Sequence, residues 1–476
     1  MSVDNYPRDL VGYGCHPPHP RWPNDARIAV QFVINYEEGG ENNILHGDAA
    51  SEAFLSEIVG AQPWPGQRHM NMESIYEYGS RVGFWRLWRI FTQRKLPVTV
   101  FAIATAMARN PDAVAAMKEA GWEIATHGLK WIDYKDYTAG AERAHVDEAI
   151  RIHTEVTGER PLGFYQGRTS VHSLDVAMAE QGFLYSADSY ADELPYWVEG
   201  PHGQQLIVPY TLDANDMRFA TPQGFNSGDQ FFAYLKDSFD TLYAEGAEQP
   251  RMMSVGLHCR LAGRPGRAAA LARFLDYVAG HDQVWVATRL DIARHWIRTH
   301  PPDGGYKPSH MPRALFVEVF GDIFEHTPGI AERAHRAGLA AIDDTADGLH
   351  TTLMGVVRAM SRDDKLALIS AHPELAGHEA VAGTMTGDST GEQARLGFTA
   401  LSRAELDRVS DVNRRYRDKF GMPLIVALAL HADRASVMAE MERRTGSDVE
   451  TEIAMAIEQI SHITKARLAK KFAGSP

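Results

Sequence analysis

The sequence predicts an α/β fold, specifically a β/α barrel, followed by a separate all-α domain. Three observations carry this prediction. Short apolar runs alternate with helical stretches over the first 300 residues, prolines and glycines then cluster together, and β-branched runs nearly disappear after that cluster. The chain has 476 residues, whereas one domain usually has roughly 100–200, so two domains are expected.

The apolar runs of the first part are expected to be strands of a parallel sheet. Between several of them lie alanine-rich segments with helical periodicity, such as Pro111–Ala120 and Arg267–Ala279. Strands that alternate with helices indicate repeated β-α units, and about seven or eight such units favour a barrel over an open sheet. The expected strands are Ile28–Ile34, Pro97–Ala104, Glu123–Thr126, Leu162–Tyr165, Leu184–Ala187, Leu206–Tyr210, Met252–Leu257 and Val284–Ala287.

The boundary between the two domains is expected at residues 301–313. Too many helix breakers fall here for a packed element, and this composition is typical of a linker. The breakers are Pro301, Pro302, Gly304, Gly305, Pro308 and Pro312. The sequence therefore predicts a barrel domain over residues 1–300 and a helical domain over residues 314–476.

Composition limits the partners and the compartment. Lys plus Arg number 48 and Asp plus Glu number 62, a formal charge of −14, which repels nucleic acid and anionic lipid. The only cysteines, Cys15 and Cys259, exclude a disulfide framework and a cysteine-ligated zinc site. Residues 2–6 lack the pattern of a signal peptide, and no apolar stretch of about 18 residues occurs. We expect a cytoplasmic homo-oligomer that binds neither nucleic acid nor membrane.

Polar side chains follow the expected strands of the barrel, where chemistry gathers in this fold. They are Glu37 and Glu38 after the first run, His127 after the third, Tyr165 and Arg168 after the fourth, Asp188 after the fifth, Asn215, Asp216 and Arg218 after the sixth, and His258 and Arg260 after the seventh.

This set of side chains fits the hydrolysis of an amide-like bond. Crowding of two acids raises one pKa, so Glu37 or Glu38 is the expected general base. His127 or His258 would protonate the leaving nitrogen, and an arginine would stabilise the oxyanion; Arg168 also fits a surface ion pair. Adjacent glutamates in a loop also fit a solvated surface, and a histidine after a strand also fits a structural role. Only their shared placement after strands favours a site.

Four segments carry a resemblance to a known family. They are Asn35–Asn42, His127–Tyr134, Phe164–Arg168 and Asp188–Trp197. In order and spacing they resemble the polysaccharide deacetylase superfamily and, within it, the allantoinase branch, over most of residues 8–300. The resemblance implies a distorted β/α barrel of the NodB-like type. It also implies the opening of the cyclic amide ring of allantoin to give allantoate.

The departures from the deacetylase pattern predict a site without metal or other cofactor. Metal-dependent members carry an Asp-Asp pair and two histidines four residues apart, where this chain has Glu37-Glu38 and, in place of the second histidine, Trp131. A tryptophan N–H has no lone pair for a metal. Trp131 is then expected to form one wall of a pocket that binds a flat ring. Tyr165, Arg168 and Asp188 are the further expected substrate contacts.

The last helix gives a clue in the second domain. Ser447 and Glu450 form an S-x-x-E capping box, so the helix is expected to start there. An apolar stripe of 3.6 periodicity then runs from Val449 to Ile463, through Ile453, Ala456 and Ile460. Arg467 stands on the same stripe. An arginine on a line facing the core needs an anion, unless its head reaches water at the helix end.

Other segments of this domain resemble the family that decarboxylates 2-oxo-4-hydroxy-4-carboxy-5-ureidoimidazoline (OHCU), an all-helical fold. The resemblance covers about residues 314–471 and rests on Ser370–Gly377, Ser389–Ala394, Phe320–Glu325, Asn413–Tyr416 and Lys419–Ile425. It implies catalytic roles for His372 and Glu392. The implied substrate contacts are Ser389, Gln393, Ile425 and Arg467. Ser389 and Glu392 also fit a capping box, which is a structural alternative for that glutamate.

The two resemblances together imply consecutive steps of urate breakdown. Decarboxylation of OHCU yields (S)-allantoin, and ring opening consumes it. The expected substrates are therefore small ureido or hydantoin compounds. The alternative is a metal-dependent carbohydrate N-deacetylase followed by a helical oligomerisation module, and Trp131 at the second histidine position argues against it.

Overall fold

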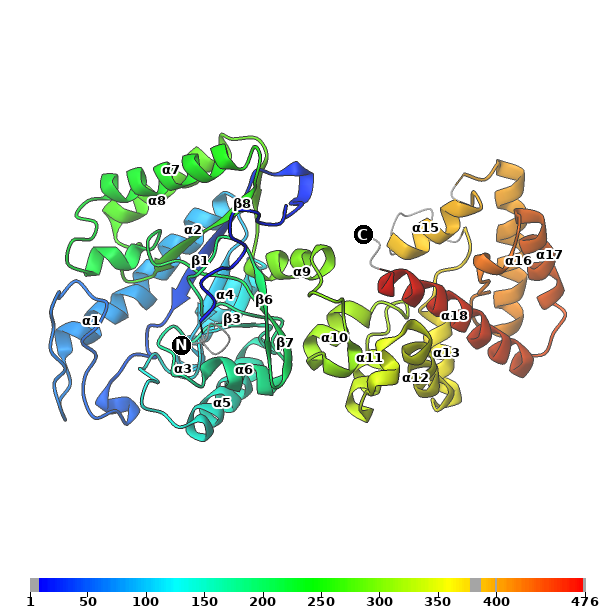
Figure 1. The fold of residues 1–476 in the computed structure, drawn as a ribbon, viewed down its shortest axis with the longest axis horizontal. Coiled ribbons are helices and arrows are strands. Elements are labelled where there is room, and N and C mark those ends of the chain that lie inside the picture. Colours follow the sequence, from blue (N-terminus) through cyan, green and yellow to red (C-terminus); the bar gives the residue numbers. More distant parts are fainter. Residues whose placement is uncertain (1–7, 377–386, 399, 474–476) are drawn as a thin grey trace. The chain divides into compact units, whose positions relative to one another are not determined.

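The computed structural model describes residues 8–376, 387–398 and 400–473. Residues 2–6, used above to judge the N-terminus, and Gly377, the end of a matching segment, lie outside these ranges. The chain divides into two compact units, Met1–Pro301 and Pro302–Pro476 (Figure 1). The Pro/Gly-rich stretch contains this division and ends where helix α10 (Arg313–Phe320) begins. None of the helices in the described ranges is long and apolar enough to cross a membrane.

The first unit is a distorted β/α barrel. Its sheet runs in the order β6-β7-β5-β4-β3-β2-β1-β8, with β9 paired to the first half of β1. All neighbours are parallel except β6, which is antiparallel to β7. The strands are β1 (Ile28–Tyr36), β2 (Thr99–Ala102), β3 (Glu123–Thr126), β4 (Gly163–Phe164), β5 (Tyr185–Ser186), β6 (Tyr196–Gly200), β7 (Gly203–Ile207), β8 (Arg251–His258) and β9 (Val284–Val286).

Each of the eight expected runs contains or overlaps a strand, so the predicted fold class is confirmed. The sequence prediction missed β6, which forms a hairpin with β7 and shifts that strand toward the N-terminus, to Gly203–Ile207 instead of Leu206–Tyr210. After β7 the carbonyls of Val208 and Pro209 accept hydrogen bonds from the buried Arg289 guanidinium.

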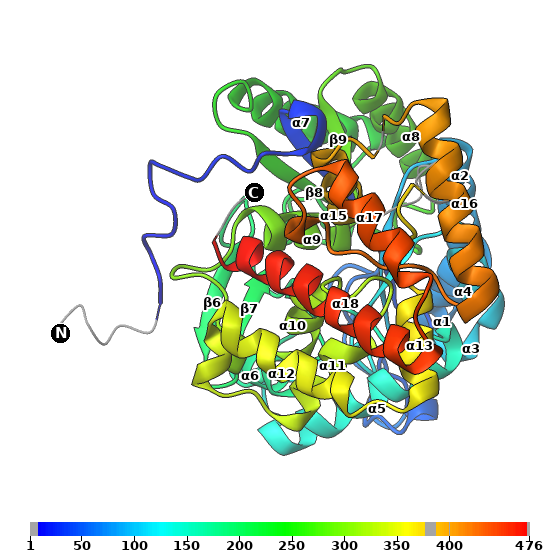
Figure 2. The same cartoon turned by 90° about the vertical axis from the view of Figure 1, so that its right-hand side faces the viewer.

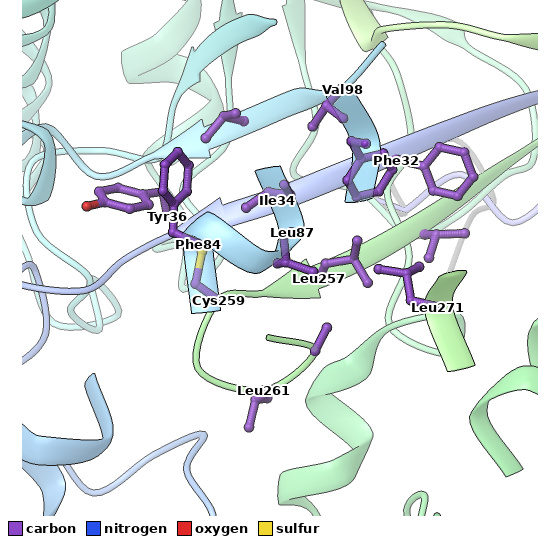
Figure 3. Close-up of a cluster of buried hydrophobic side chains, with 14 of the residues drawn as sticks. Phe32, Ile34, Tyr36, Phe84, Leu87, Val98, Leu257, Cys259, Leu261 and Leu271 are labelled. Atoms are coloured by element: carbon purple, nitrogen blue, oxygen red, sulfur yellow. The ribbon is translucent and has the colours of Figure 1, made fainter. Parts of the chain in front are cut away.

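Strand parity decides which side chains face the barrel interior. All nine residues of β1 are buried, and successive side chains of a strand point to opposite faces. One set packs in the main apolar core outside the sheet, together with Leu257 of β8 (Figure 3); its members are Ile28, Val30, Phe32, Ile34 and Tyr36. The other set includes Gln31 and Asn35, which hydrogen-bond to Arg289 and Tyr210 across the interior. Parity therefore directs Glu37 inward.

Helices cover the outer face of the sheet and close the main core. Each buried apolar side chain there contributes roughly 1.5–3 kcal/mol. The helices of this unit are α1 (Met70–Tyr78), α2 (Phe84–Gln93), α3 (Ala104–Arg109), α4 (Pro111–Glu119), α5 (Ala139–Thr157), α6 (Ser173–Glu180), α7 (Gly228–Glu245), α8 (Pro265–Ala279) and α9 (Arg289–Thr299). A π-helical turn, Gly79–Gly83, joins α1 to α2. A Cβ on Gly83 would lie 1.9 Å from the Cys259 carbonyl oxygen, so only glycine lets this turn reach the loop after β8.

The described elements of the second unit are all helical. They are α10, α11 (Gly329–Ala337), α12 (Ala346–Arg358), α13 (Arg362–Ser370), α15 (Gly387–Arg395), α16 (Arg403–Phe420), α17 (Arg434–Arg444) and α18 (Val449–Phe472), with short 3-10 turns between some of them. Helix α18 lies beside α12 (Figures 1 and 2), and the His350 ring bonds the Ser461 carbonyl between them. The Arg444–Glu452 ion pair, 2.8 Å long, is almost fully buried.

The start of α18 corrects the predicted capping box. The helix begins at Val449, and the Asp448 carboxylate accepts the Thr451 amide at 3.0 Å as its N-cap. Glu450 instead pairs with Arg362 at 2.8 Å. Asp448 has the extended backbone that an N-cap needs, and its carboxylate reaches the free amides of the first turn. The cap is therefore one residue later than predicted.

Candidate active sites

The side chains of three residues at or after strand ends of the barrel meet at the carboxylate of Glu37. Glu37 itself directly follows β1. The Oε1 atom lies 3.3 Å from His127 Nε2, after β3, and 3.5 Å from His258 Nε2, at the end of β8. The Oε2 atom lies 2.7 Å from the Arg260 guanidinium. All four side chains are buried. We call them, together with Asp216, the Glu37 cluster.

His258 is held between two carboxylates. Its Nδ1 lies 2.6 Å from Asp216 Oδ1, and the other Asp216 oxygen accepts the backbone amides of His258 and Ala262 at 2.8 Å. Burial alone lowers the pKa of His258, but the charges of Glu37 and Asp216 outweigh burial and raise it to about 9. His258 is therefore an imidazolium at neutral pH, with its Nδ1–H facing Asp216 and its Nε2–H facing Glu37.

Glu37 is ionised in this environment. Burial raises the pKa of its carboxyl, but the positive charges of Arg260 and His258 and the hydrogen bonds from both histidines outweigh burial and hold it well below its ordinary value. The Arg260 guanidinium is itself fully buried, 4.3 Å from the Tyr76 ring centroid. The cluster therefore places a fixed anion beside two fixed cations, away from bulk water.

Glu38 lies beside this cluster, with Oε1 3.5 Å from the Arg260 guanidinium, and its catalytic role stays a prediction. Its carboxylate accepts the backbone amides of Arg260 and Glu37 at 3.1 and 3.2 Å. It also packs against Gly79, where a Cβ would lie 2.4 Å from Glu38 Oε1. Burial raises the pKa of Glu38. Parity explains the difference, because the residue after Glu37 points to the opposite face.

The expected substrate-binding side chains Trp131, Tyr165 and Arg168 line the cluster. The Tyr165 and His127 ring centroids are 4.7 Å apart. The Arg260 guanidinium lies 5.1 Å from the Trp131 ring centroid, and the Arg168 guanidinium lies 4.1 Å from it. Aromatic rings and guanidinium groups therefore lie next to the cluster, a combination that suits a flat polar ring.

Asp188, the fourth expected substrate contact, binds the loop after β4. Its two oxygens accept the backbone amides of Gly167 and Gln166, each at 2.8 Å. Burial raises the pKa of this carboxyl to about 7, although the two amide hydrogen bonds oppose the effect. Asp188 thus fixes the loop that carries Tyr165 and Arg168, and its role as a substrate contact stays a prediction.

A second candidate site surrounds a cavity of about 430 Å³ in the helical unit. His372, Ser389, Glu392, Gln393, Ile425 and Arg467, all expected from the sequence, line it. His372 Nδ1 lies 3.0 Å from the Leu368 carbonyl, so it donates there, while Nε2 has no hydrogen-bond partner among the described residues. Burial, aided by Arg467, lowers the pKa of His372 to about 4. A neutral imidazole therefore offers Nε2 as an acceptor.

Arg467 forms ion pairs with two carboxylates of the protein, Glu392 and Glu325. It donates from Nε to one oxygen of Glu392 at 2.9 Å and from Nη2 to the other at 3.1 Å, and from Nη1 to Glu325 at 2.9 Å. Nη2 also donates to the Ser389 hydroxyl at 3.0 Å, which in turn donates to Glu325. Ser389 therefore lies inside α15, with its hydroxyl in the ion-pair network, and does not cap the helix. The predicted stripe brings Arg467 to this network, 4% exposed.

Comparisons with known proteins assign both units. A family model for polysaccharide deacetylase matches residues 72–178, and one for OHCU decarboxylase matches residues 309–469. The crystal structure of Puue allantoinase is 61% identical, covers 62% of this chain and 99% of its own, and superposes with a TM-score of 0.62. The OHCU decarboxylase of Haloferax volcanii is 33% identical over 33% of this chain and 89% of its own length.

The chain belongs to both families. A polysaccharide deacetylase-like domain is fused to an OHCU decarboxylase domain. The mouse OHCU decarboxylase adds a match of 32% identity over 34% of this chain and 89% of its own length.

Some polysaccharide deacetylases depend on a metal ion, so the side chains of the Glu37 cluster are compared with the ligands that a metal ion needs. A zinc site needs at least three His, Cys, Asp or Glu ligands, and within the described ranges no three such side chains are grouped to hold one. In the Glu37 cluster, His258 Nδ1 is committed to Asp216, and the Arg260 cation lies against Glu37. The residues present do not fit a divalent cation.

Sequence reasoning missed three members of these sites. Asp216 and Arg260 stood among the polar residues after strands but were not singled out, and Glu325 lay unremarked in a matching segment. Strand parity gives no signal for Arg260, because β8 ends at His258 and Arg260 lies in the turn that follows. Glu325 had no signal either, because its partners Ser389 and Arg467 lie far along the chain.

Proposed function

We propose that this chain is a bifunctional enzyme of urate breakdown. Its C-terminal domain decarboxylates OHCU to (S)-allantoin, and its N-terminal domain hydrolyses allantoin to allantoate. The observation that carries the first-domain assignment is the Glu37 cluster, a buried base, acid and cation in a chain 61% identical to Puue allantoinase. The His372 cavity, in a domain matched to OHCU decarboxylases, supports the other half.

In the hydrolysis, the ionised Glu37 takes a proton from water as the oxygen attacks the ring carbonyl carbon. Negative charge then develops on the carbonyl oxygen, and the fixed Arg260 guanidinium and His127 stabilise it. The His258 imidazolium gives its proton to the leaving ring nitrogen as the C–N bond breaks. The proton on Glu37 returns to His258 across the 3.5 Å contact, so the pair is restored.

In the decarboxylation, the bond between the ring and its carboxylate breaks and CO₂ leaves. The electron pair enters the imine and carbonyl system of the ring, so the substrate itself accepts it. A proton must then reach the ring carbon. The unpartnered Nε2 of neutral His372 faces the cavity, where it would take a proton from solvent and pass it to the ring carbon. Arg467 fixes the half-buried Glu392 beside it. Substrate oxygens reach Arg467 by displacing one of its present partners.

The test uses the purified full chain with three substrates, in the presence and absence of EDTA. We expect OHCU to be consumed, allantoin to be opened at an equal rate with and without EDTA, and N-acetylated chitooligosaccharides to remain intact. Loss of allantoin hydrolysis on chelation, restored by zinc, would show that the barrel uses a metal. Release of acetate from the oligosaccharides would return the first domain to carbohydrate deacetylation.

A further inference from the structure

Gln166 buries an amide group that the rest of the protein does not use. The residue is 3% exposed, and among the described residues neither Oε1 nor Nε2 of its side chain has a hydrogen-bond partner. Buried polar groups are almost always hydrogen-bonded, because an amide without a partner costs free energy. A donor and an acceptor left open side by side therefore indicate a ligand that completes them.

The surrounding loops hold this amide beside the Glu37 cluster. Gln166 follows Tyr165 after β4, and a Cβ on Gly128, the residue after His127, would lie 3.4 Å from Gln166 Oε1. Gly167 has φ +78°, and a Cβ there would lie 3.1 Å from the His127 ring. The backbone amides of Gln166 and Gly167 are both bound by Asp188. The backbone that carries the side-chain amide is thus held in place before substrate arrives.

We propose that Gln166 determines substrate specificity by reading a cis –CO–NH– edge of the substrate. Its Nε2 would donate to the carbonyl oxygen and its Oε1 would accept the neighbouring N–H. A cyclic amide or a urea presents both groups on one side, whereas the trans amide of an N-acetyl sugar points them in opposite directions. This inference rests on the proposed allantoin hydrolysis and explains why that site selects a cyclic ureide.

The experiment compares Gln166→Met, which keeps the size but removes both polar atoms, with wild type on allantoin and on hydantoin. Hydantoin lacks the ureido tail, so the two substrates distinguish the ring edge from the tail edge. We expect kcat/KM for allantoin to fall roughly 10- to 100-fold. A fall on both substrates assigns the ring edge, and a fall on allantoin alone assigns the tail. The control is Gln205→Met, a buried glutamine of β7, which should keep wild-type kinetics.

Thermal unfolding distinguishes a role of Gln166 in substrate recognition from a role in stability. Because Gln166→Met removes two unpartnered buried atoms, the free variant should unfold at the same temperature as wild type or higher. Unchanged kcat/KM for both substrates would overturn the inference, and so would a lowered unfolding temperature that accompanies the loss of activity. If wild type itself opens neither ring, the proposed hydrolysis fails first, and the Gln166 assignment fails with it.

Discussion

Glu37 and Glu38 are neighbours of the same residue type, yet their surroundings give them opposite roles. Glu37 continues the inward face of β1 and meets two histidines and Arg260, whereas Glu38 serves as an acceptor for two backbone amides. The sequence left this choice open because both acids follow the same strand. The alternation of apolar residues along β1 contained the answer, since the residue one step beyond an outward Tyr36 must point inward.

At this scale the charge of His258 is the property most open to test. Its pKa of about 9 depends on Glu37 and Asp216, and only the protonated ring can donate to the leaving nitrogen. The rate of allantoin hydrolysis should therefore fall as the pH rises through about 9. Asp216→Asn keeps the shape of the side chain but removes one of the two anions, so the alkaline fall should move to lower pH.

The measurement is kcat/KM for allantoin across the pH range for wild type, Asp216→Asn and the control Asp213→Asn. Asp213 bonds Thr211 and Tyr234 on a neighbouring loop, and its substitution should leave the profile in place. An alkaline limb that stays where it is in Asp216→Asn would mean that His258 is not the group that titrates.

Among the elements, those with a strong repeating pattern were the ones that the sequence could predict. β3 and the start of α4 lie where expected, because alternation and a proline mark them. β6 was missed because Tyr196–Gly200 is only partly buried and forms no apolar run of the kind that marks the other strands. It becomes a strand only by pairing with β7, and such pairing depends on the tertiary fold more than on local preference.

Helix α18 gives the sharpest test at the level of elements. Asp448 caps the helix by accepting the Thr451 amide, while the Ser447 side chain takes no part in the cap. Asp448→Ala should lower the urea midpoint of the helical domain, because a first-turn amide loses its acceptor. Ser447→Ala, one residue away, should leave the midpoint unchanged. Circular dichroism during urea titration measures both, and a larger loss for Ser447→Ala would restore the cap that the sequence suggested.

At the scale of the whole molecule, each site is complete within its own unit. The members of the Glu37 cluster all belong to residues 1–301, and the residues that line the His372 cavity all belong to residues 302–476. The sequence could predict this organisation because the Pro/Gly-rich stretch separates two different residue patterns. It could not predict Arg260 or Glu325 as members, because their contacts join segments that are distant along the chain.

Because the two sites lie in different units, we expect that one substitution can inactivate either site and leave the other active. His372→Ala removes the neutral imidazole of the cavity and should abolish decarboxylation of OHCU, while kcat/KM for allantoin stays at the wild-type value. Glu37→Gln removes the base of the barrel and should do the reverse, so that allantoin accumulates from OHCU. Rates for each substrate, measured separately on each variant, give the comparison.

Mixing the two variants then tests how the intermediate passes between the sites. Since each variant keeps one intact site and allantoin is a small soluble molecule, an equimolar mixture should convert OHCU to allantoate after a lag in which free allantoin builds up. The wild-type chain is expected to show a lag of the same order, because the Pro/Gly-rich segment only tethers the domains. A wild-type time course without a lag, together with a slow mixture, would mean that allantoin is passed directly from site to site.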